Sequence, residues 1–211
     1  MRENEDYEAI LPVSIPQAAN YSLPDDSLLA FYNDLEERIY WIDEQINSYT
    51  LNLIHYIIKW NKEDRDIETD KRKPIRLLIH SPGGSLEVLS AISDIIRLSK
   101  TPIIGINLSN AYSAAAMILL SCHKRYGLQG STVLFHKGSC SGIEGSYDEI
   151  ASFMEDYKKQ VAKLSAIIRE RTSFTEEEIS EKMKSDWYIS AQDCVKYGVY
   201  DGIIQSIDKF L

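Results

Sequence analysis

The sequence predicts an α/β fold in which a mainly parallel sheet packs against helices. Short apolar runs of strand length alternate with longer segments whose apolar residues recur at helical spacing. The alternation continues from about residue 38 to about residue 204, without an internal repeat or a low-complexity tract. Strands that alternate with helices along a chain are typical of parallel sheets, because a helix usually makes the crossover from one strand to the next.

Length and composition indicate an ordinary folded globular chain. The 211 residues have a mass of 24.1 kDa, which suits one large domain or two small ones. Hydrophobic residues make up 44% of the chain and charged residues 26%, and these values exclude a disordered or collagen-like protein. The net charge of −9 weighs against binding to nucleic acid or to an anionic membrane surface, so neither partner is expected.

The sequence shows no targeting or metal-binding signal. The first residues are acidic and lack the apolar core of a secretory signal peptide, and no window holds 18 apolar residues in a row. Cys122, Cys140 and Cys194 lie far apart and form no Cys-x-x-Cys pair, so neither a zinc site nor a disulfide framework is expected. We therefore expect no bound metal and a cytoplasmic location.

The pattern divides the chain into a short arm and one folded domain. Residues 1–30 hold three of the six prolines, and we predict an extended arm there, followed by a domain over 31–211. The charged run over 61–73 is predicted to be a solvated loop, and the Cys122-His-Lys-Arg stretch to end a helix. Strands are expected over residues 38–42, 75–79, 102–106, 132–135 and 199–204. Helices are expected over residues 44–61, 85–99, 113–122 and 147–171, after Thr175, and from Ser190 to Gly198.

A Ser-Pro-Gly-Gly turn over residues 81–84 connects an expected strand to an expected helix. Its two glycines allow positive φ angles and a close approach of the backbone to a ligand. Backbone N–H groups at such a turn can hold an anion or a developing oxyanion. A tight turn without any ligand explains the same residues, and the spacing alone does not decide between the two interpretations.

Three polar residues, Ser113, His136 and Asp186, are candidates for nucleophilic catalysis. Ser113 begins an expected helix, where a serine serves as the helix cap or as a nucleophile. His136 ends an apolar strand, where a histidine is a structural residue or the base that activates a serine. Asp186 lies between two expected helices. An aspartate there serves as a helix cap, as one partner of a surface ion pair, or as the group that orients the histidine. The spacing of the three residues along the chain allows their side chains to meet in the fold, but it does not establish that they meet.

Six short motifs, taken in order, resemble the ClpP family of caseinolytic serine proteases. The resemblance runs from about Glu37 to Ile204, and six motifs in order are far more specific than any one of them. The motifs are Glu37-Arg-Ile-Tyr-Trp-Ile-Asp, Ile79-His-Ser-Pro-Gly-Gly84, Asn110-Ala-Tyr-Ser113, Leu134-Phe-His136, Asp186-Trp-Tyr-Ile-Ser-Ala191 and Tyr197-Gly-Val-Tyr-Asp201.

The resemblance implies a serine endopeptidase with no metal or cofactor of its own. The family's catalytic triad falls on Ser113, His136 and Asp186. Its oxyanion donors fall on the backbone N–H groups of Gly84 and Ala114. The reaction that it implies is the cleavage of unfolded polypeptides by acyl transfer through the serine.

The resemblance also implies a ClpP/crotonase-type fold and a ring assembly. The helix expected over 147–171 would be the projecting handle of that fold. Such proteins form homo-oligomeric rings of seven subunits, and two rings stack into a tetradecamer around a chamber. The chain has no Gly-x-x-x-x-Gly-Lys-[Ser/Thr] phosphate loop, so ATP would be used by a separate AAA+ unfoldase partner. The arm over 1–30 is expected to be the gate of the chamber or the docking element for that partner.

The chain departs from the family's pattern near the expected nucleophile. Ser109 stands where the family usually has glycine, Ala114-Ala115 where it has Met-Gly, and Gly138 where it often has proline. These departures indicate a divergent branch with altered substrate pockets.

Three other functions remain open at this stage. The chain could be a catalytically silent ring subunit that acts as a scaffold or regulator, or an acyl-CoA enzyme of the related crotonase fold. It could also be a Ser–Lys peptidase that uses Lys137. Against the last, successive strand residues point to opposite faces, so His136 and Lys137 cannot both serve Ser113.

Overall fold

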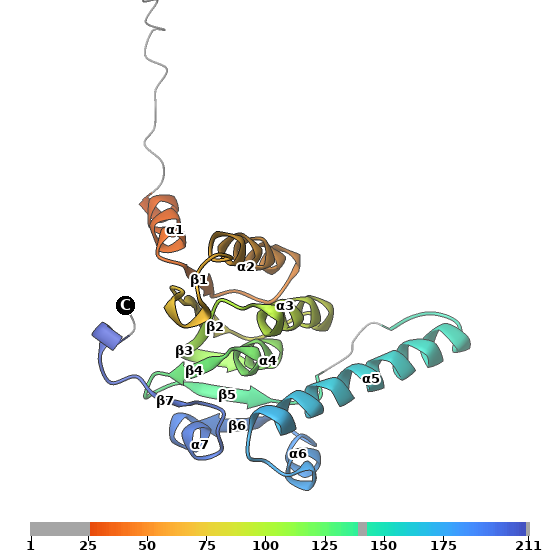
Figure 1. Cartoon of the computed structure of the whole chain (residues 1–211). Coiled ribbons are helices and arrows are strands. Elements are labelled where there is room, and N and C mark those ends of the chain that lie inside the picture. Colours follow the sequence, from red (N-terminus) through yellow and green to blue (C-terminus); the bar gives the residue numbers. More distant parts are fainter. Residues whose placement is uncertain (1–25, 139–142, 210–211) are drawn as a thin grey trace, which may run out of the picture.

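The computed structural model describes residues 26–138 and 143–209, which form a seven-stranded sheet with helices packed on it (Figure 1). All strand pairs are parallel except β5 with β6, so the predicted mainly parallel α/β fold is confirmed. The strands are β1 (Ile39–Ile42), β2 (Ile75–Ser81), β3 (Ile103–Tyr112), β4 (Lys124–Gly127), β5 (Thr132–Phe135), β6 (Trp187–Ser190) and β7 (Gly202–Ile203).

The long strand β3 connects the two parts of the sheet. Along one edge it pairs with β2, and β1 lies beyond β2. Along its other edge, residues 104–107 pair with β4, and residues 110–112 pair with β5. The sheet therefore divides at β3, with β7 added to β4 and β6 added to β5.

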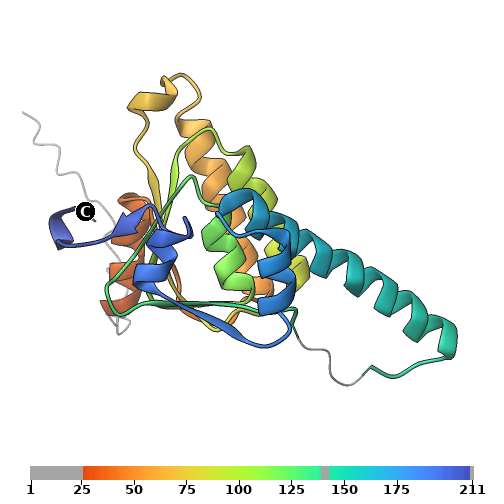
Figure 2. The same ribbon diagram turned by 90° about the horizontal axis from the view of Figure 1, so that it is seen from below.

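Apart from α1, which was not predicted, the helices lie close to where the sequence predicts them. In both views α2, α3 and α4 lie side by side along one side of the sheet, and α5 projects away from the body (Figures 1 and 2). In the described part of the chain, no helix has the length and apolar character needed to cross a membrane. The α-helices are α1 (Asp26–Glu36), α2 (Asn52–Glu63), α3 (Leu86–Leu98), α4 (Ala114–Ser121), α5 (Tyr147–Arg171), α6 (Glu176–Lys182) and α7 (Ala191–Lys196). Three 3₁₀ turns, η1 (Ser48–Leu51), η2 (Thr69–Lys71) and η3 (Ile207–Lys209), complete the elements.

Helix α5 has the bounds that the sequence predicts, 147–171. Ser146 caps its start, and Glu149 completes the capping box. Its buried residues, Leu164 and Ile168, lie in its C-terminal part and join the core. The preceding half is almost entirely exposed, which is why this helix stands out from the molecule.

Two strands were not predicted. The Cys122-His-Lys-Arg stretch, expected to end a helix, instead leads into β4, because α4 already ends at Ser121. Strand β6 occupies a segment expected to be a connection between two helices. It has only four residues, and the Ser190 cap of α7 follows at once, so the segment is too short for a clear alternation.

Two other expectations are corrected at the ends of elements. The helix expected from residue 44 begins with η1 at Ser48, because Ile46 instead forms a β-bridge with Gly84. The last strand is shorter than the expected 199–204 and contains only Gly202 and Ile203.

The arm expected over residues 1–30 lies mostly outside the described residues. Its last five residues, 26–30, belong to α1, so this part is helical rather than extended. The division into an arm and a domain stays a prediction.

A buried ion pair ties the charged run over 61–73 to the core, although the sequence predicts a solvated loop there. The Arg38 guanidinium donates to both carboxylate oxygens of Asp64, at 2.7 and 2.9 Å, and the Thr101 hydroxyl donates to the same carboxylate at 2.8 Å. The Asp64 side chain is 2% exposed. The hydrogen bond from Arg38 lowers the pKa of Asp64 below its ordinary value, so the carboxylate is charged at neutral pH.

We expect Asp64→Asn to lower the free energy of unfolding by about 3 kcal/mol at pH 7, because it leaves the Arg38 charge without its main partner. The depressed pKa means that the carboxylate stabilises the fold above the unfolded-state pKa of about 4 and loses this contribution as the pH falls. The difference in the free energy of unfolding between the wild type and Asp64→Asn should therefore be smaller at pH 3 than at pH 7. Chemical denaturation of both proteins at both pH values measures this difference.

Asp66→Asn is the matched control, because the Asp66 side chain is 88% exposed in the same charged run. We expect it to change the stability by less than about 0.5 kcal/mol. An equally small loss for Asp64→Asn would contradict the role of the buried pair.

Candidate active site

The pairing of β3, β5 and β6 brings the three candidate residues to one place. Tyr112 of β3 lies opposite Leu134 of β5, and Phe135 of β5 lies opposite Trp187 of β6. Each candidate is the chain neighbour of one of these residues. One further step along the antiparallel β5–β6 pair sets His136 opposite Asp186, and Ser113 follows Tyr112 directly.

The Ser113 hydroxyl lies against the His136 ring. Nε2 of His136 is 2.7 Å from Oγ of Ser113, a hydrogen-bond distance that suits removal of the hydroxyl proton. The Ser113 backbone N–H donates to the carbonyl of Leu134 at 2.9 Å, so the serine is also fixed to β5 by its main chain.

Asp186 completes the line of three side chains but is held more loosely. Its Oδ1 lies 3.4 Å from Nδ1 of His136, longer than the 2.7–2.9 Å of a charge-assisted hydrogen bond. The Asp186 side chain is 59% exposed, whereas that of His136 is 26% exposed. The carboxylate is therefore in place to orient the ring, in a contact that is open to water.

Ser113 stands at the cap position of α4 but does not act as a cap. Its side chain makes no cap hydrogen bond, which rules against the capping interpretation of this serine. Its backbone has φ 53° and ψ −121°, a conformation that is strained for a residue with a side chain. A strained strand-to-helix turn that exposes a serine hydroxyl is the arrangement of nucleophilic serines in several hydrolases.

The glycine turn lies directly against this serine. A Cβ atom on Gly83 would lie 2.5 Å from the carbonyl oxygen of Tyr112 and 2.7 Å from Cβ of Ser113, so only glycine fits there. Gly83 has φ +93°, which also favours glycine. The backbone of the glycine turn therefore touches the backbone around Ser113. A functional role for this turn requires such a close approach.

Two backbone N–H groups beside Ser113 are candidates for binding an oxyanion. The β-bridge between Ile46 and Gly84 uses the Gly83 carbonyl and the Ser85 N–H, so the Gly84 N–H takes no part in it. Ala114 is the first residue of α4, and the N–H of a first helical residue has no partner within the helix.

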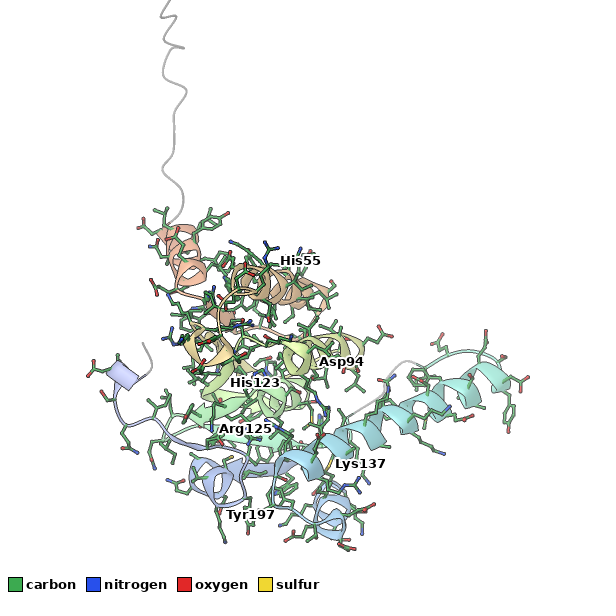
Figure 3. The ribbon with its side chains drawn as sticks, viewed as in Figure 1. His55, Asp94, His123, Arg125, Lys137 and Tyr197 are labelled. Atoms are coloured by element: carbon green, nitrogen blue, oxygen red, sulfur yellow. The ribbon has the colours of Figure 1, made fainter. Side chains whose placement is uncertain are left out.

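Helix α4 is a rigid support for the nucleophile turn. All eight of its residues are buried, beginning with Ala114 beside Ser113. At its other end the Arg171 guanidinium donates to the carbonyls of Leu120 and Cys122, which would otherwise lack partners. Arg125, labelled in Figure 3, donates in turn to the Arg171 carbonyl.

The other candidate nucleophiles and bases do not form a comparable site. Burial raises the pKa of the Cys122 and Cys194 thiols to about 12, so neither is a thiolate at neutral pH. His123 accepts a backbone hydrogen bond from Ile103, and burial lowers its pKa. Across residues 26–138 and 143–209, no three side chains of His, Cys, Asp or Glu gather as metal ligands.

Lys137 does not take the place of His136. Its side chain is exposed, while the Ser113 hydroxyl meets the histidine ring. This geometry speaks against a Ser–Lys pair.

The comparison with protein families agrees with the motifs. The model of the family described as Clp protease matches residues 27–207 of the chain. The chain belongs to the Clp protease family.

Several curated proteins of the Clp protease family are similar to the chain. One is an ATP-dependent Clp protease proteolytic subunit of Dehalococcoides mccartyi, 33% identical over 174 residues, which are 81% of this chain and 84% of that protein. Two proteins named ATP-dependent Clp protease proteolytic subunit 2 are also similar. That of Treponema pallidum is 31% identical over 135 residues, 63% of this chain and 67% of that protein. That of Treponema denticola is 34% identical over 136 residues, 64% of this chain and 68% of that protein.

Strand β6 is the part of this Clp protease site that sequence reasoning missed. The residue types made Ser113, His136 and Asp186 candidates, and the antiparallel β5–β6 pair is what brings the aspartate next to the histidine. The aromatic and branched residues of the Trp-Tyr-Ile segment were the available signal, since such residues favour strands.

We expect Gly83→Ala to displace the Ser113 turn, because the added methyl group collides with backbone atoms on both sides of the serine. The rate at which Ser113 reacts with a small fluorophosphonate should fall at least about tenfold, since small misplacements of reacting groups are costly. Gly130→Ala is the control, because a Cβ there has no atom within 4 Å. Equal rates for Gly83→Ala and the wild type would mean that the glycine turn does not support the serine.

Proposed function

We propose that this Clp protease family chain is a serine endopeptidase subunit that cleaves unfolded polypeptides by acyl transfer. The observation that carries the proposal is the 2.7 Å contact between the His136 ring and a Ser113 hydroxyl that makes no cap hydrogen bond. A serine in a strained turn, with a histidine in reach and a carboxylate behind it, is the arrangement that nucleophilic catalysis needs.

The first half of the proposed reaction forms an acyl-enzyme. Oγ of Ser113 attacks the carbonyl carbon of the scissile peptide bond, and its proton passes to Nε2 of His136. Asp186 holds the ring in the tautomer that exposes Nε2 and stabilises the imidazolium. The C–N bond then breaks, and His136 gives the proton to the leaving amine, which leaves an ester on Ser113.

The second half returns the enzyme to its starting state. Water attacks the ester carbonyl while His136 takes one of its protons, and the same proton goes back to Oγ of Ser113 as the carboxylic acid product departs. In both halves the negative oxygen of the tetrahedral intermediate is held by the N–H groups of Gly84 and Ala114. Donors fixed in a buried turn are effective because they need no rearrangement as the charge develops.

The exposed face of α5 supports a ring assembly. The projecting half of this helix carries an exposed apolar stripe at helical spacing, which consists of Tyr147, Ile150, Phe153 and Met154. We propose that seven subunits form a homo-oligomeric ring and that two rings meet through this stripe to form a tetradecamer. The active sites then line an inner chamber that only unfolded chains enter.

The proposed partner is a separate AAA+ unfoldase, which uses ATP and delivers the polypeptide. The similar proteins are named as proteolytic subunits of ATP-dependent Clp proteases, and the sequence contains no phosphate loop. We also propose a cytoplasmic location, which is supported by two buried cysteines, Cys122 and Cys194, that are free thiols in the described chain.

A catalytically silent ring subunit is the second candidate function. The loose contact of Asp186 with His136 in the single chain favours it, because a poorly held carboxylate orients the ring less well. Under the main proposal, contacts within the ring draw Asp186 closer and exclude water from it.

The first test compares the wild type with Ser113→Ala by intact mass after treatment with a small fluorophosphonate. We expect one adduct per wild-type chain and none on the variant, and a loss of cleavage of fluorescently labelled casein by at least about a thousandfold. Ser109→Ala is the matched control, because Ser109 lies four residues earlier, half-buried, with its hydroxyl directed at Asn110. A reactive Ser113→Ala, or an unreactive wild type in assembled rings, would contradict a catalytic Ser113 and favour the silent subunit.

The second test concerns the stripe on α5. We expect Phe153→Asp to halve the mass of the assembled particle in analytical ultracentrifugation, because it puts a charge into an apolar contact between rings. Ser152→Asp is the control on the same helix: Ser152 is exposed on the side opposite Ile150 and Met154, and the substitution should leave the mass unchanged. A Phe153→Asp particle of wild-type mass would show that the rings meet elsewhere.

A further inference from the structure

One side chain of α5 contacts the main chain directly after His136. The Tyr157 hydroxyl donates to the carbonyl of Lys137 at 2.7 Å. Lys137, labelled in Figure 3, lies where the chain leaves β5 beside α5. The tyrosine is half-buried, and its ring stacks on that of Phe153 with centroids 6.2 Å apart and planes 14° from parallel.

The backbone at Gly138 is shaped around the same hydroxyl group. Gly138 has φ +85°, and a Cβ atom there would lie 2.6 Å from Oη of Tyr157. The positive φ angle favours glycine here, and any side chain at this position would also have to displace the Tyr157 hydroxyl. Both observations place the Tyr157 hydroxyl at the turn that follows His136.

The main chain after His136, at this turn, is held by fewer of the described contacts than the main chain before it. On the other side, β5 ends at Phe135, which is fixed by its pairing with Trp187. In the single chain Asp186 holds the ring of His136 only loosely, because its carboxylate is 3.4 Å away and 59% exposed. Of the contacts described, the hydrogen bond from Tyr157 is the one that fixes the main chain just beyond the histidine.

We propose that Tyr157 is a positioning residue for His136: by holding the Lys137 carbonyl, it keeps the imidazole in reach of Ser113. The inference rests on the proposed function, because it gives the histidine the role of a base. Tyr157 acts through the main chain and touches neither the serine nor the substrate. It also connects the histidine to the projecting helix α5.

The test measures the two constants of fluorophosphonate inactivation, kinact and KI, for the full-length Tyr157→Phe variant. Removal of the hydroxyl should lower kinact about tenfold, since a displaced base costs rate. KI and the thermal midpoint should stay at their wild-type values, because the ring, its stacking on Phe153 and the reagent's binding surface are unchanged. Tyr147→Phe is the matched control: it removes a hydroxyl from an 85% exposed ring on the same helix and should change neither constant.

A double-mutant cycle with Gly138→Ala examines the same contact from the other side. Alone, Gly138→Ala should lower kinact, because the methyl group meets the tyrosine oxygen and strains the backbone. In the Tyr157→Phe background the additional loss should be several-fold smaller, because the oxygen that it meets is gone.

The possible outcomes separate the inference from the proposed function. An unreactive wild type contradicts the proposed function and this inference with it. A reactive wild type whose kinact is unchanged in Tyr157→Phe contradicts the inference alone. A lower thermal midpoint with unchanged kinact would show that the hydroxyl only stabilises the fold, and additive effects in the cycle would also overturn the proposal.

Discussion

The register of three neighbouring strands is the constraint on which the candidate site depends. Because β5 pairs with β3 on one edge and with β6 on the other, the residues just beyond the paired positions meet at one point. Those residues are Ser113, His136 and Asp186, which lie 23 and 50 positions apart in the chain. Side chains in a strand alternate between faces, so a slip of one residue between β3 and β5 would turn His136 away from Ser113, and a slip between β5 and β6 would turn Asp186 away from His136. The site is therefore as stable as this part of the sheet.

Helices α4 and α5, which pack outside the sheet, support this strand register. Helix α4 is buried along its whole length, and the Arg171 guanidinium satisfies carbonyls at the end opposite Ser113. The same helix that ends at Arg171 also carries Tyr157, which reaches the turn after His136. Helix α5 thus contacts the supports of both the serine and the histidine while its first half projects from the body.

Local sequence patterns predicted most helices and strands. The features that they did not predict depend on contacts between residues far apart in the chain. Helix α5 has the predicted bounds, because its caps and periodicity are encoded within the helix itself. Strand β6 was missed because four residues beside a helix cap carry too little pattern, and its pairing with β5 depends on residues about 50 positions away. The burial of Asp64 was missed for a similar reason, since its partner Arg38 lies 26 positions earlier. At Ser113 the sequence allowed a cap or a nucleophile, and the tertiary turn with φ 53° excludes the cap.

A crystal structure of the assembled protein after reaction with a small fluorophosphonate would test the candidate active site most directly. We expect a phosphonyl group on Oγ of Ser113, with its oxygen within hydrogen-bond distance of the N–H groups of Gly84 and Ala114. We also expect a direct hydrogen bond between His136 and Asp186. An unmodified Ser113, or a phosphonyl oxygen that points away from both N–H groups, would contradict the assignment of this strand junction as the active site.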